Sequence, residues 1–243
     1  MNVLLLSDIH SNLPALEAVL EDANTTFDIG ETWALGDLVG YGAEPAECLS
    51  LLTEIDALAV AGNHDLAVAG TISTADFNHV AAAAVSWTKG VLDGGYVEHL
   101  RGLPVTLERH GITLVHGSPR APAWEYVDRE DVAASALNNV DTVGLAVGHT
   151  HFPVIYEQRG REIERVQPVT LQWHSVAGSK FLVNPGSVGQ PRDRDPRASY
   201  AVFDLDAESI THMRVEYDVE LAAGKIREAG LPTFLADRLR VGM

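Results

Sequence analysis

Short apolar runs alternate with segments of helical periodicity along the chain. Runs rich in Val, Leu, Ile and Ala predict β-strands at Val3–Leu6, Trp33–Leu35, Leu58–Ala61, Ile112–Val115, Gly144–Val147, Phe181–Val183 and Tyr200–Leu205. Most of these runs are apolar throughout instead of alternating with polar residues. That pattern is typical of strands that are covered on both faces of the sheet.

The segments between these strands predict helices. Apolar residues recur at helical spacing in Leu13–Leu20, Pro45–Ile55, Phe77–Leu92 and Asp131–Asn138. Pro14 and Pro45 stand near the start of their segments, where the missing N–H of proline costs no helical hydrogen bond. The order of strands and helices predicts a layered α/β protein.

The last third of the chain has a different pattern. Pro153–Gly160 and Arg161–Thr170 predict a β-hairpin with its turn near Gly160, and Glu220–Met243 predicts two short helices broken at Gly230-Leu231-Pro232. We find no internal repeat and no linker-like composition. We therefore expect a single domain over residues 1–243, with residues 220–243 as a C-terminal helical tail.

Composition narrows the class of protein. The chain has 17 Lys and Arg against 34 Asp and Glu, a formal net charge of −17, which disfavours long nucleic acids and anionic membranes as partners. No apolar run is long enough to cross a membrane, and the N-terminal residues lack the basic start of a signal peptide. Cys48 is the only cysteine, so an internal disulfide and a cysteine-based metal site are excluded. We expect a cytoplasmic protein.

Residues that could carry chemistry follow five of the predicted strands. They are Asp8 and His10, Asp37, Asn63 and His64, His116, and His149 with His151. Ligands of open α/β sheets bind beyond the carboxyl ends of the strands, so we expect these loops to meet at one place. Asp8/His10 and His149/His151 are i, i+2 pairs, and in extended backbone both side chains of such a pair point to one side.

The number of candidate ligands indicates more than one metal ion. Two carboxylates, one amide and four imidazoles exceed the three protein ligands of a single zinc ion with an open position. Seven ligands suit two metal ions that share one carboxylate, an arrangement that promotes displacement at phosphate esters. Mixed imidazole and oxygen ligation favours Mn, Fe, Zn, Co or Ni over Mg or Ca.

These blocks resemble the signature of the calcineurin-like metallophosphoesterase superfamily. In the family's order they are Asp8-Ile9-His10, Gly36-Asp37, Gly62-Asn63-His64-Asp65, His116-Gly117 and Gly148-His149-Thr150-His151. Asn184-Pro185-Gly186-Ser187 is similar to a further element of the small bacterial and archaeal phosphodiesterase branch, which is related to diadenosine tetraphosphatases. The resemblance implies a two-sheet β-sandwich flanked by helices, in four layers α/β/β/α, with the metals at the strand ends.

The resemblance also implies a role for each residue. One metal would take Asp8, His10, Asp37 and His151, and the other Asp37, Asn63, His116 and His149, so that Asp37 bridges them. A metal-bridging hydroxide would attack phosphorus in line, and His64 would protonate the leaving alkoxide. Manganese is the first expectation for the metal, with Fe, Zn, Ni or Co as alternatives.

The second block departs from the pattern of the protein phosphatases in this superfamily. Gly40 cannot supply the carboxylate that orients their catalytic histidine, and Tyr41 cannot supply their phosphate-binding guanidinium. This favours a small phosphodiester or nucleotide substrate over a phosphoprotein. Arg120 is a candidate for binding substrate phosphate, and Trp124 or Tyr126 could stack on a base. The other interpretation, which we favour for this segment, is a structured proline-rich loop with buried aromatic side chains.

Other functions remain open at this stage. One is a phosphoesterase-like scaffold that binds protein partners without catalysis, although a scaffold would be expected to lose metal ligands that this chain retains. A phosphomonoesterase or nucleotidase of the same fold is a second. Arg192, Arg194 and Arg197 alternate with Asp193 and Asp195, and we expect a solvated loop whose charges pair with one another.

Overall fold

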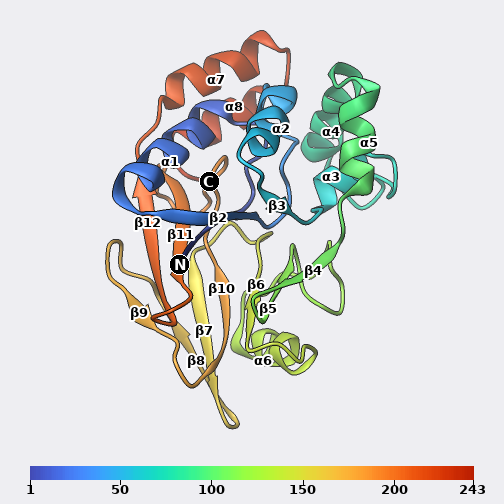
Figure 1. Ribbon diagram of the computed structural model, residues 1–243. Coiled ribbons are helices and arrows are strands. Elements are labelled where there is room, and N and C mark those ends of the chain that lie inside the picture. The colour runs from blue at the N-terminus through green and yellow to red at the C-terminus, as the bar shows by residue number, and fades with distance from the viewer.

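Two six-stranded sheets pack face to face in the computed structural model, which describes residues 1–243 (Figure 1). The first sheet contains β1 (Asn2–Leu6), β2 (Ile29–Ala34), β3 (Leu58–Ala59), β9 (His174–Ser175), β11 (Ala198–Asp204) and β12 (Ser209–Val215), in the order β3-β2-β1-β11-β12-β9. The second contains β4 (Thr106–Arg109), β5 (Ile112–Val115), β6 (Gly144–Ala146), β7 (Val154–Arg159), β8 (Glu162–Val166) and β10 (Lys180–Asn184), in the order β4-β5-β6-β10-β7-β8.

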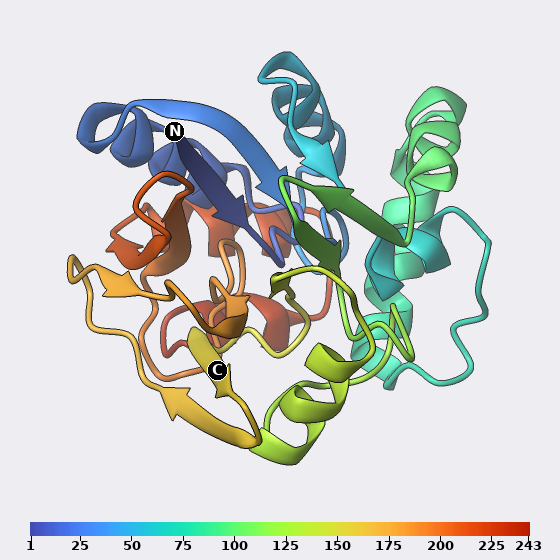
Figure 2. The ribbon, with the colours of Figure 1, turned by 60° about the horizontal axis from the view of Figure 1, so that its bottom comes forward.

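Helices cover the outer faces of both sheets (Figures 1 and 2). The first sheet is covered by α1 (Leu13–Thr26) and α2 (Pro45–Glu54), and the second by α6 (Glu130–Asn138). Helix α7 (Val219–Glu228) packs on α1, and α8 (Thr233–Leu239) packs on α7. Beside these layers lie α3 (Asn63–Val68), α4 (His79–Val91) and α5 (Gly94–Gly102). The predicted four-layer α/β/β/α sandwich is confirmed.

Successive side chains of a strand point to opposite faces of the sheet, so each strand contributes apolar side chains to two layers of the core. In β1, Leu4 and Leu6 pack in the core beneath α1 and α2, whereas Val3 and Leu5 pack in the core between the two sheets. Leu145 and Leu182 of the second sheet pack against α6 in a third core. Strands buried on both faces explain why the apolar runs show little alternation.

Five elements were not predicted from the sequence pattern: α3, α5, β4, β9 and β12. The structure gives a physical reason for three of them. Strand β12 buries Thr211 and His212, so its core-facing positions do not form an apolar run. Helix α5 begins and ends with glycine, and its start is set by the Asp93 carboxylate, which accepts from the N–H groups of Gly95 and Tyr96. Strand β4 pairs only with β5 at the edge of its sheet and is mostly exposed.

The C-terminal tail packs against the rest of the chain. Ala223, Ile226 and Leu235 of α7 and α8 share an apolar cluster with Tyr41 and with Ala84 of α4. The tail therefore supports the loop that follows β2. No helix has the length and apolar character that crossing a bilayer requires.

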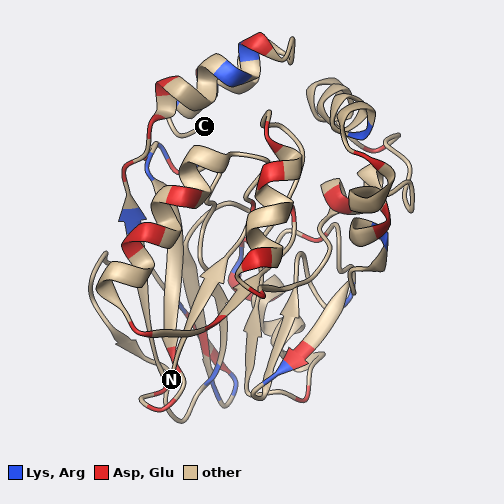
Figure 3. Cartoon of the chain, turned by 45° about the horizontal axis from the view of Figure 1, so that its top comes forward, with Lys and Arg blue, Asp and Glu red and all other residues tan.

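Acidic side chains are concentrated on the outer helices. Figure 3 shows Asp and Glu along the exposed faces of α1 and α2, and neither helix contains Lys or Arg. These two helices therefore contribute negative charge to the surface without any compensating Lys or Arg of their own.

Candidate metal centre

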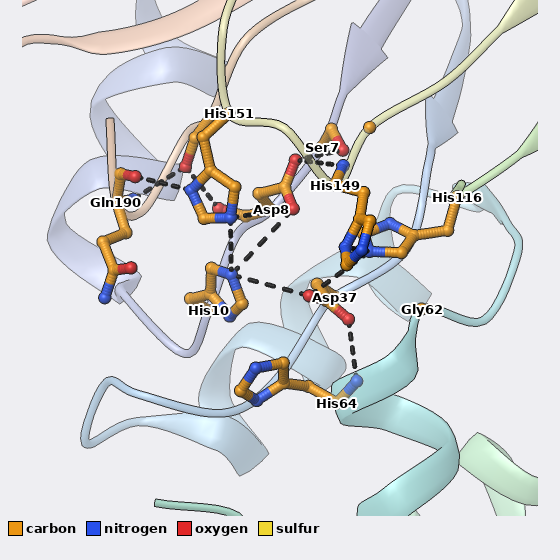
Figure 4. Close-up of polar contacts among 12 residues, drawn as sticks. Ser7, Asp8, His10, Asp37, Gly62, His64, His116, His149, His151 and Gln190 are labelled. Atoms are coloured by element: carbon orange, nitrogen blue, oxygen red, sulfur yellow. Dashed lines mark hydrogen bonds and ion pairs between the residues drawn. The ribbon is translucent and has the colours of Figure 1, made fainter. Parts of the chain in front are cut away.

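The five predicted loops meet at one end of the sandwich, where the strands of both sheets terminate (Figure 4). Every predicted ligand and His64 are buried there: Asp8, His10, Asp37, Asn63, His64, His116, His149 and His151. Buried polar side chains of this kind require partners, so their hydrogen bonds indicate what the cluster is built to hold.

A first group of donor atoms consists of Asp8, His10 and His151. The Nε2 atoms of His10 and His151 face each other at 3.3 Å, and Asp8 Oδ1 lies 3.2 Å from His151 Nε2 and 3.9 Å from His10 Nε2. Asp8 Oδ2 accepts from Ser7 Oγ at 2.7 Å and from the His149 N–H at 3.1 Å. Its Oδ1 has no hydrogen-bond partner and is left free toward the imidazoles.

Backbone carbonyls determine where the lone pairs of these imidazoles point. His10 Nδ1 donates to the carbonyl of Val39 at 3.2 Å, and His151 Nδ1 donates to that of Gln190 at 2.6 Å. In the neutral rings both Nε2 atoms are then acceptors, so two lone pairs and a free carboxylate oxygen converge without a proton between them. A cation among these three atoms would satisfy all of them, and carbonyl partners of this kind are usual behind metal-bound histidines.

A second group consists of Asp37, His116 and His149. His116 Nε2 lies 3.3 Å from Asp37 Oδ2 and 3.1 Å from His149 Nδ1, while its Nδ1 donates to the Leu35 carbonyl at 2.8 Å. Asn63 begins α3 beside this group, and its buried Oδ1 has no hydrogen-bond partner. Carboxylate, amide and imidazole donors together suit a divalent transition metal.

Asp37 connects the two groups. Its Oδ2 lies 3.3 Å from His116 Nε2 and 3.7 Å from His10 Nε2, which belong to different groups. Its Oδ1 accepts from the N–H of His64 at 2.9 Å, which leaves Oδ2 for the space between the groups. The position is the one expected of a shared carboxylate ligand.

Electrostatics favours cations in this cluster. Burial raises the pKa of Asp8 to about 7, and the nearby charge of Asp37 adds to the effect. Burial lowers the pKa values of His10 and His151 well below the usual range, which keeps these imidazoles neutral. His116 is the exception: although burial opposes its protonation, the Asp37 carboxylate raises its pKa to about 9. Positive charge is therefore strongly stabilised beside Asp37.

The backbone at the candidate ligands is not extended, so the expectation that each i, i+2 pair points to one side is wrong for His149 and His151, although Asp8 and His10 do lie in one group. Asp8, His10, Asp37, His149 and His151 all have positive φ, between 51° and 67°. As a result His149 and His151 point into different groups instead of to one side. Such left-handed conformations cost free energy in residues with a Cβ and are concentrated at functional sites.

His64 is oriented by packing. Its ring lies between those of Tyr41 and Phe77, with centroid distances of 4.4 and 5.1 Å, and its buried Nδ1 has no hydrogen-bond partner. Asp65 does not hold it, because that carboxylate accepts from the N–H groups of Gly62 and Val39. Burial lowers the pKa of His64 to about 4.

An open pocket leads to the cluster. Trp124 and Tyr126 stand at its rim, 38% and 48% exposed, so the interpretation that these aromatic side chains are buried is wrong. The Tyr126 ring stacks on His149 with a centroid distance of 4.0 Å, and Phe77 contacts Trp124 edge to face at 5.3 Å. The rim thus offers flat aromatic surface beside the second donor group.

The arginine at this pocket is not the predicted one. Arg120 pairs with Glu125 at 2.5 Å and does not line the pocket, whereas Arg192 does. The expected pairing within the Arg192 loop is also incomplete. Asp193 pairs with Arg214 from β12, a contact that the local charge pattern does not reveal.

The loop from Asn184 to Gln190 joins the ligand loops. Ser187 Oγ donates to the carbonyl of Asp8 at 2.8 Å, and the Gly189 N–H donates to the same carbonyl at 3.0 Å. Asn184 Nδ2 donates to the Gly148 carbonyl at 2.7 Å and to Thr150 Oγ1 at 3.0 Å. The loop therefore holds the segments that carry Asp8 and His149 in place.

Replacing Asn184 by alanine is expected to weaken metal binding. The change removes both hydrogen bonds that orient the segment from Gly148 to Thr150, and outer-shell changes of this kind typically cost ~10- to 100-fold in metal affinity. Calorimetric titration of metal-stripped protein with Mn²⁺ measures the effect, with the exposed Asn24→Ala as control. Equal Mn²⁺ affinity in Asn184→Ala and in the unaltered protein would contradict this role.

Comparison with known proteins agrees with the geometry. Residues 1–208 match the calcineurin-like phosphoesterase superfamily domain. The chain is 39% identical over 245 residues to MJ0912 of Methanocaldococcus jannaschii, covering 99% of this chain and 98% of that protein. It is 31% identical to the phosphodiesterase YfcE of Escherichia coli, over 86% of this chain and 91% of YfcE.

A solved structure is similar over the whole chain. The crystal structure of a metallophosphoesterase from Sphaerobacter thermophilus superposes with a TM-score of 0.91 at 42% sequence identity. The match covers 100% of this chain and 99% of that one. The similarity therefore includes the tail after residue 208 as well as the ligand loops.

Proposed function

This chain belongs to the calcineurin-like phosphoesterase superfamily, and from that premise we propose that it hydrolyses phosphodiester bonds with the help of two divalent metal ions. Phosphoester hydrolysis is the activity of the family. Beyond this family activity, we propose that the site holds two metal ions, that the substrate is a diester and that the metal is manganese.

The observation that carries the proposal is the pair of donor groups joined by Asp37. The first ion would be held by Asp8, His10, His151 and Asp37, and the second by Asp37, Asn63, His116 and His149. The free Asp8 Oδ1 and Asn63 Oδ1 atoms fit this assignment. Two bound divalent ions would acidify a water molecule and neutralise charge on the phosphoryl group.

His64 supplies proton transfer in this proposal. Its ring borders the same pocket, with its centroid 5.0 Å from that of His10, so it can reach a leaving oxygen above the donor groups. Burial lowers the pKa of the free imidazole to about 4, but a negatively charged phosphoryl group in the pocket would raise it again. A protonated His64 beside bound substrate would then act as the general acid.

Two observations support a small diester as the substrate. The relative YfcE is named a phosphodiesterase. The net charge of −17 disfavours long nucleic acids. Tyr41 stands where the protein phosphatases have a phosphate-binding arginine. That substitution is no longer evidence for a diester substrate, because Arg192 places a guanidinium in the pocket. A cytoplasmic location stays a prediction.

Metal removal tests the proposal. We expect chelator-stripped protein to leave bis(p-nitrophenyl) phosphate intact and Mn²⁺ to restore turnover, with a rate above that for the monoester p-nitrophenyl phosphate. Release of p-nitrophenolate measures both rates, and Fe²⁺, Zn²⁺, Ni²⁺ and Co²⁺ are tested alongside. A faster monoester rate would favour a phosphomonoesterase. No turnover of either ester with any metal would favour a non-catalytic scaffold.

A further inference from the structure

An arginine without a carboxylate partner lines the pocket that leads to the donor groups. Arg192 Nη2 donates to the side-chain oxygen of Gln190 at 3.0 Å, and its Nε is buried without a hydrogen-bond partner. The aspartates of its own loop are engaged elsewhere, since Asp193 contacts Arg214 and Asp195 contacts Arg197. A guanidinium so placed retains hydrogen-bonding capacity for an anion.

The guanidinium is positioned over the reactive part of the pocket. Its Cζ lies 6.0 Å from the centre of the Tyr41 ring, and that ring lies 4.5 Å from His10 and 4.4 Å from His64. Arg192 also lines the same pocket as His64, His149 and His151. The field of Arg192 therefore reaches the donor groups themselves.

We propose that Arg192 binds a non-bridging oxygen of the substrate's phosphoryl group and so sets the balance between monoester and diester substrates. The inference rests on the phosphoesterase function proposed above. Tyr41 occupies the place of a phosphate-binding arginine in the second sequence block, and here its ring supports a guanidinium that comes from another loop. A planar guanidinium suits phosphate because it can donate two parallel hydrogen bonds.

A second arginine adds positive charge nearby. Arg238 of α8 donates from Nε to an oxygen of Met243, and burial together with the charge of Arg192 lowers its pKa to about 10. Two like charges that disfavour each other are both stabilised by an anion between or beside them. The stabilisation grows with the charge of the anion, so Arg192 favours a dianion, such as a monoester or inorganic phosphate, more than a diester monoanion.

The test compares Arg192→Gln with Arg192→Lys and with a matched control. Arg194→Gln makes the same charge change two positions away, at an exposed side chain with no ion pair. For each Mn²⁺-loaded protein, kcat and KM are measured on bis(p-nitrophenyl) phosphate and p-nitrophenyl phosphate. Competitive inhibition by inorganic phosphate and the bound Mn²⁺ per chain are measured on the same samples.

Arg192→Gln is expected to weaken phosphate inhibition and monoester kcat/KM by roughly 10- to 100-fold, and diester kcat/KM by less, with metal content unchanged. Arg192→Lys should recover part of the loss, and Arg194→Gln should behave as the unaltered protein. Values for Arg192→Gln within about twofold of the unaltered protein would overturn the proposal, as would an equal loss in Arg194→Gln.

Failure of the esterase proposal would be seen separately. If the unaltered protein turns over neither ester, binding of inorganic phosphate is measured by calorimetry on the same three variants. Weaker phosphate binding in Arg192→Gln alone would then support Arg192 as an anion-binding residue. Absence of phosphate binding, or equal binding in all variants, would overturn it.

Discussion

Asp37→Asn should reduce kcat/KM by more than about 1,000-fold and lower the bound metal from two ions per chain. Asp37 Oδ2 lies between the two donor groups, so its charge is the only one that both ions would share. Metal ions contribute several kcal/mol to the stabilisation of a phosphoryl transition state, and each 1.36 kcal/mol corresponds to a tenfold change in rate. An amide keeps the shape of the side chain but not the bridging charge.

The variant is expected to fold. Asparagine tolerates the φ of 52° at this position, and its amide oxygen can still accept from the His64 N–H. Without metal, removing the Asp37 charge relieves repulsion with Asp8 and Asp65 but also removes the attraction that raises the pKa of His116. When Mn²⁺ is added to the metal-stripped proteins, the Tm of the variant should therefore rise less than that of the unaltered protein.

Asp56→Asn provides the matched control. Asp56 is exposed after α2, far from the centre, and has the same φ of 52°. Turnover, metal content by elemental analysis and Tm with and without Mn²⁺ are compared for both variants. Two ions per chain and unaltered turnover in Asp37→Asn would show that Asp37 is not a shared ligand.

His64→Asn should lower kcat by ~10²- to 10⁴-fold while metal content stays unchanged. The ring borders the pocket, and although His64 forms a group of donor atoms with His10 and Asp37, the proposal does not assign it as a ligand of either ion. A general acid matters most when the leaving group is a poor one, so the loss should be larger for alkyl or nucleoside diesters than for p-nitrophenyl esters. The same fractional loss for all leaving groups would argue against proton donation by His64.

Gly40→Ala tests the orientation of His64 without removing the imidazole. A Cβ at Gly40 would lie 2.3 Å from His64 Nδ1, so the ring must move. Gly40 also has a φ of 90°, and Gly178, with a φ of 73° and open space around its Cα, is the control for backbone strain. We expect Gly40→Ala to lose activity toward the level of His64→Asn, and Gly178→Ala to keep it.

Much of the fold follows from local pattern. Strands such as β1 and β5 are buried on both faces, and their continuous apolar runs reveal them without knowledge of their neighbours. Strand β12 could not be found this way, because His212 is buried only by virtue of donating to the carbonyl of Asn184 in another strand. The sequence pattern reveals buried apolar residues. It does not reveal a buried polar residue whose hydrogen-bond partner lies far away in the sequence.

The candidate site, too, was predictable only in part. The sequence alone determined the types and order of the candidate ligands, because each one directly follows a predicted strand and parallel strand ends share one edge. It could not determine the direction of each side chain. That depends on left-handed backbone at residues such as His149 and His151, which places these neighbours in different groups.

Tertiary structure alone decided the partners that act across the chain. The carbonyls of Leu35, Val39 and Gln190 orient His116, His10 and His151, and each is at least 29 residues away from its histidine. Arg192 lines the pocket because its neighbour Asp193 is taken by β12, whereas Arg120, adjacent to a ligand in sequence, is held by Glu125. Sequence spacing determines local geometry, but hydrogen bonds and ion pairs between distant segments exist only after the sheets have packed.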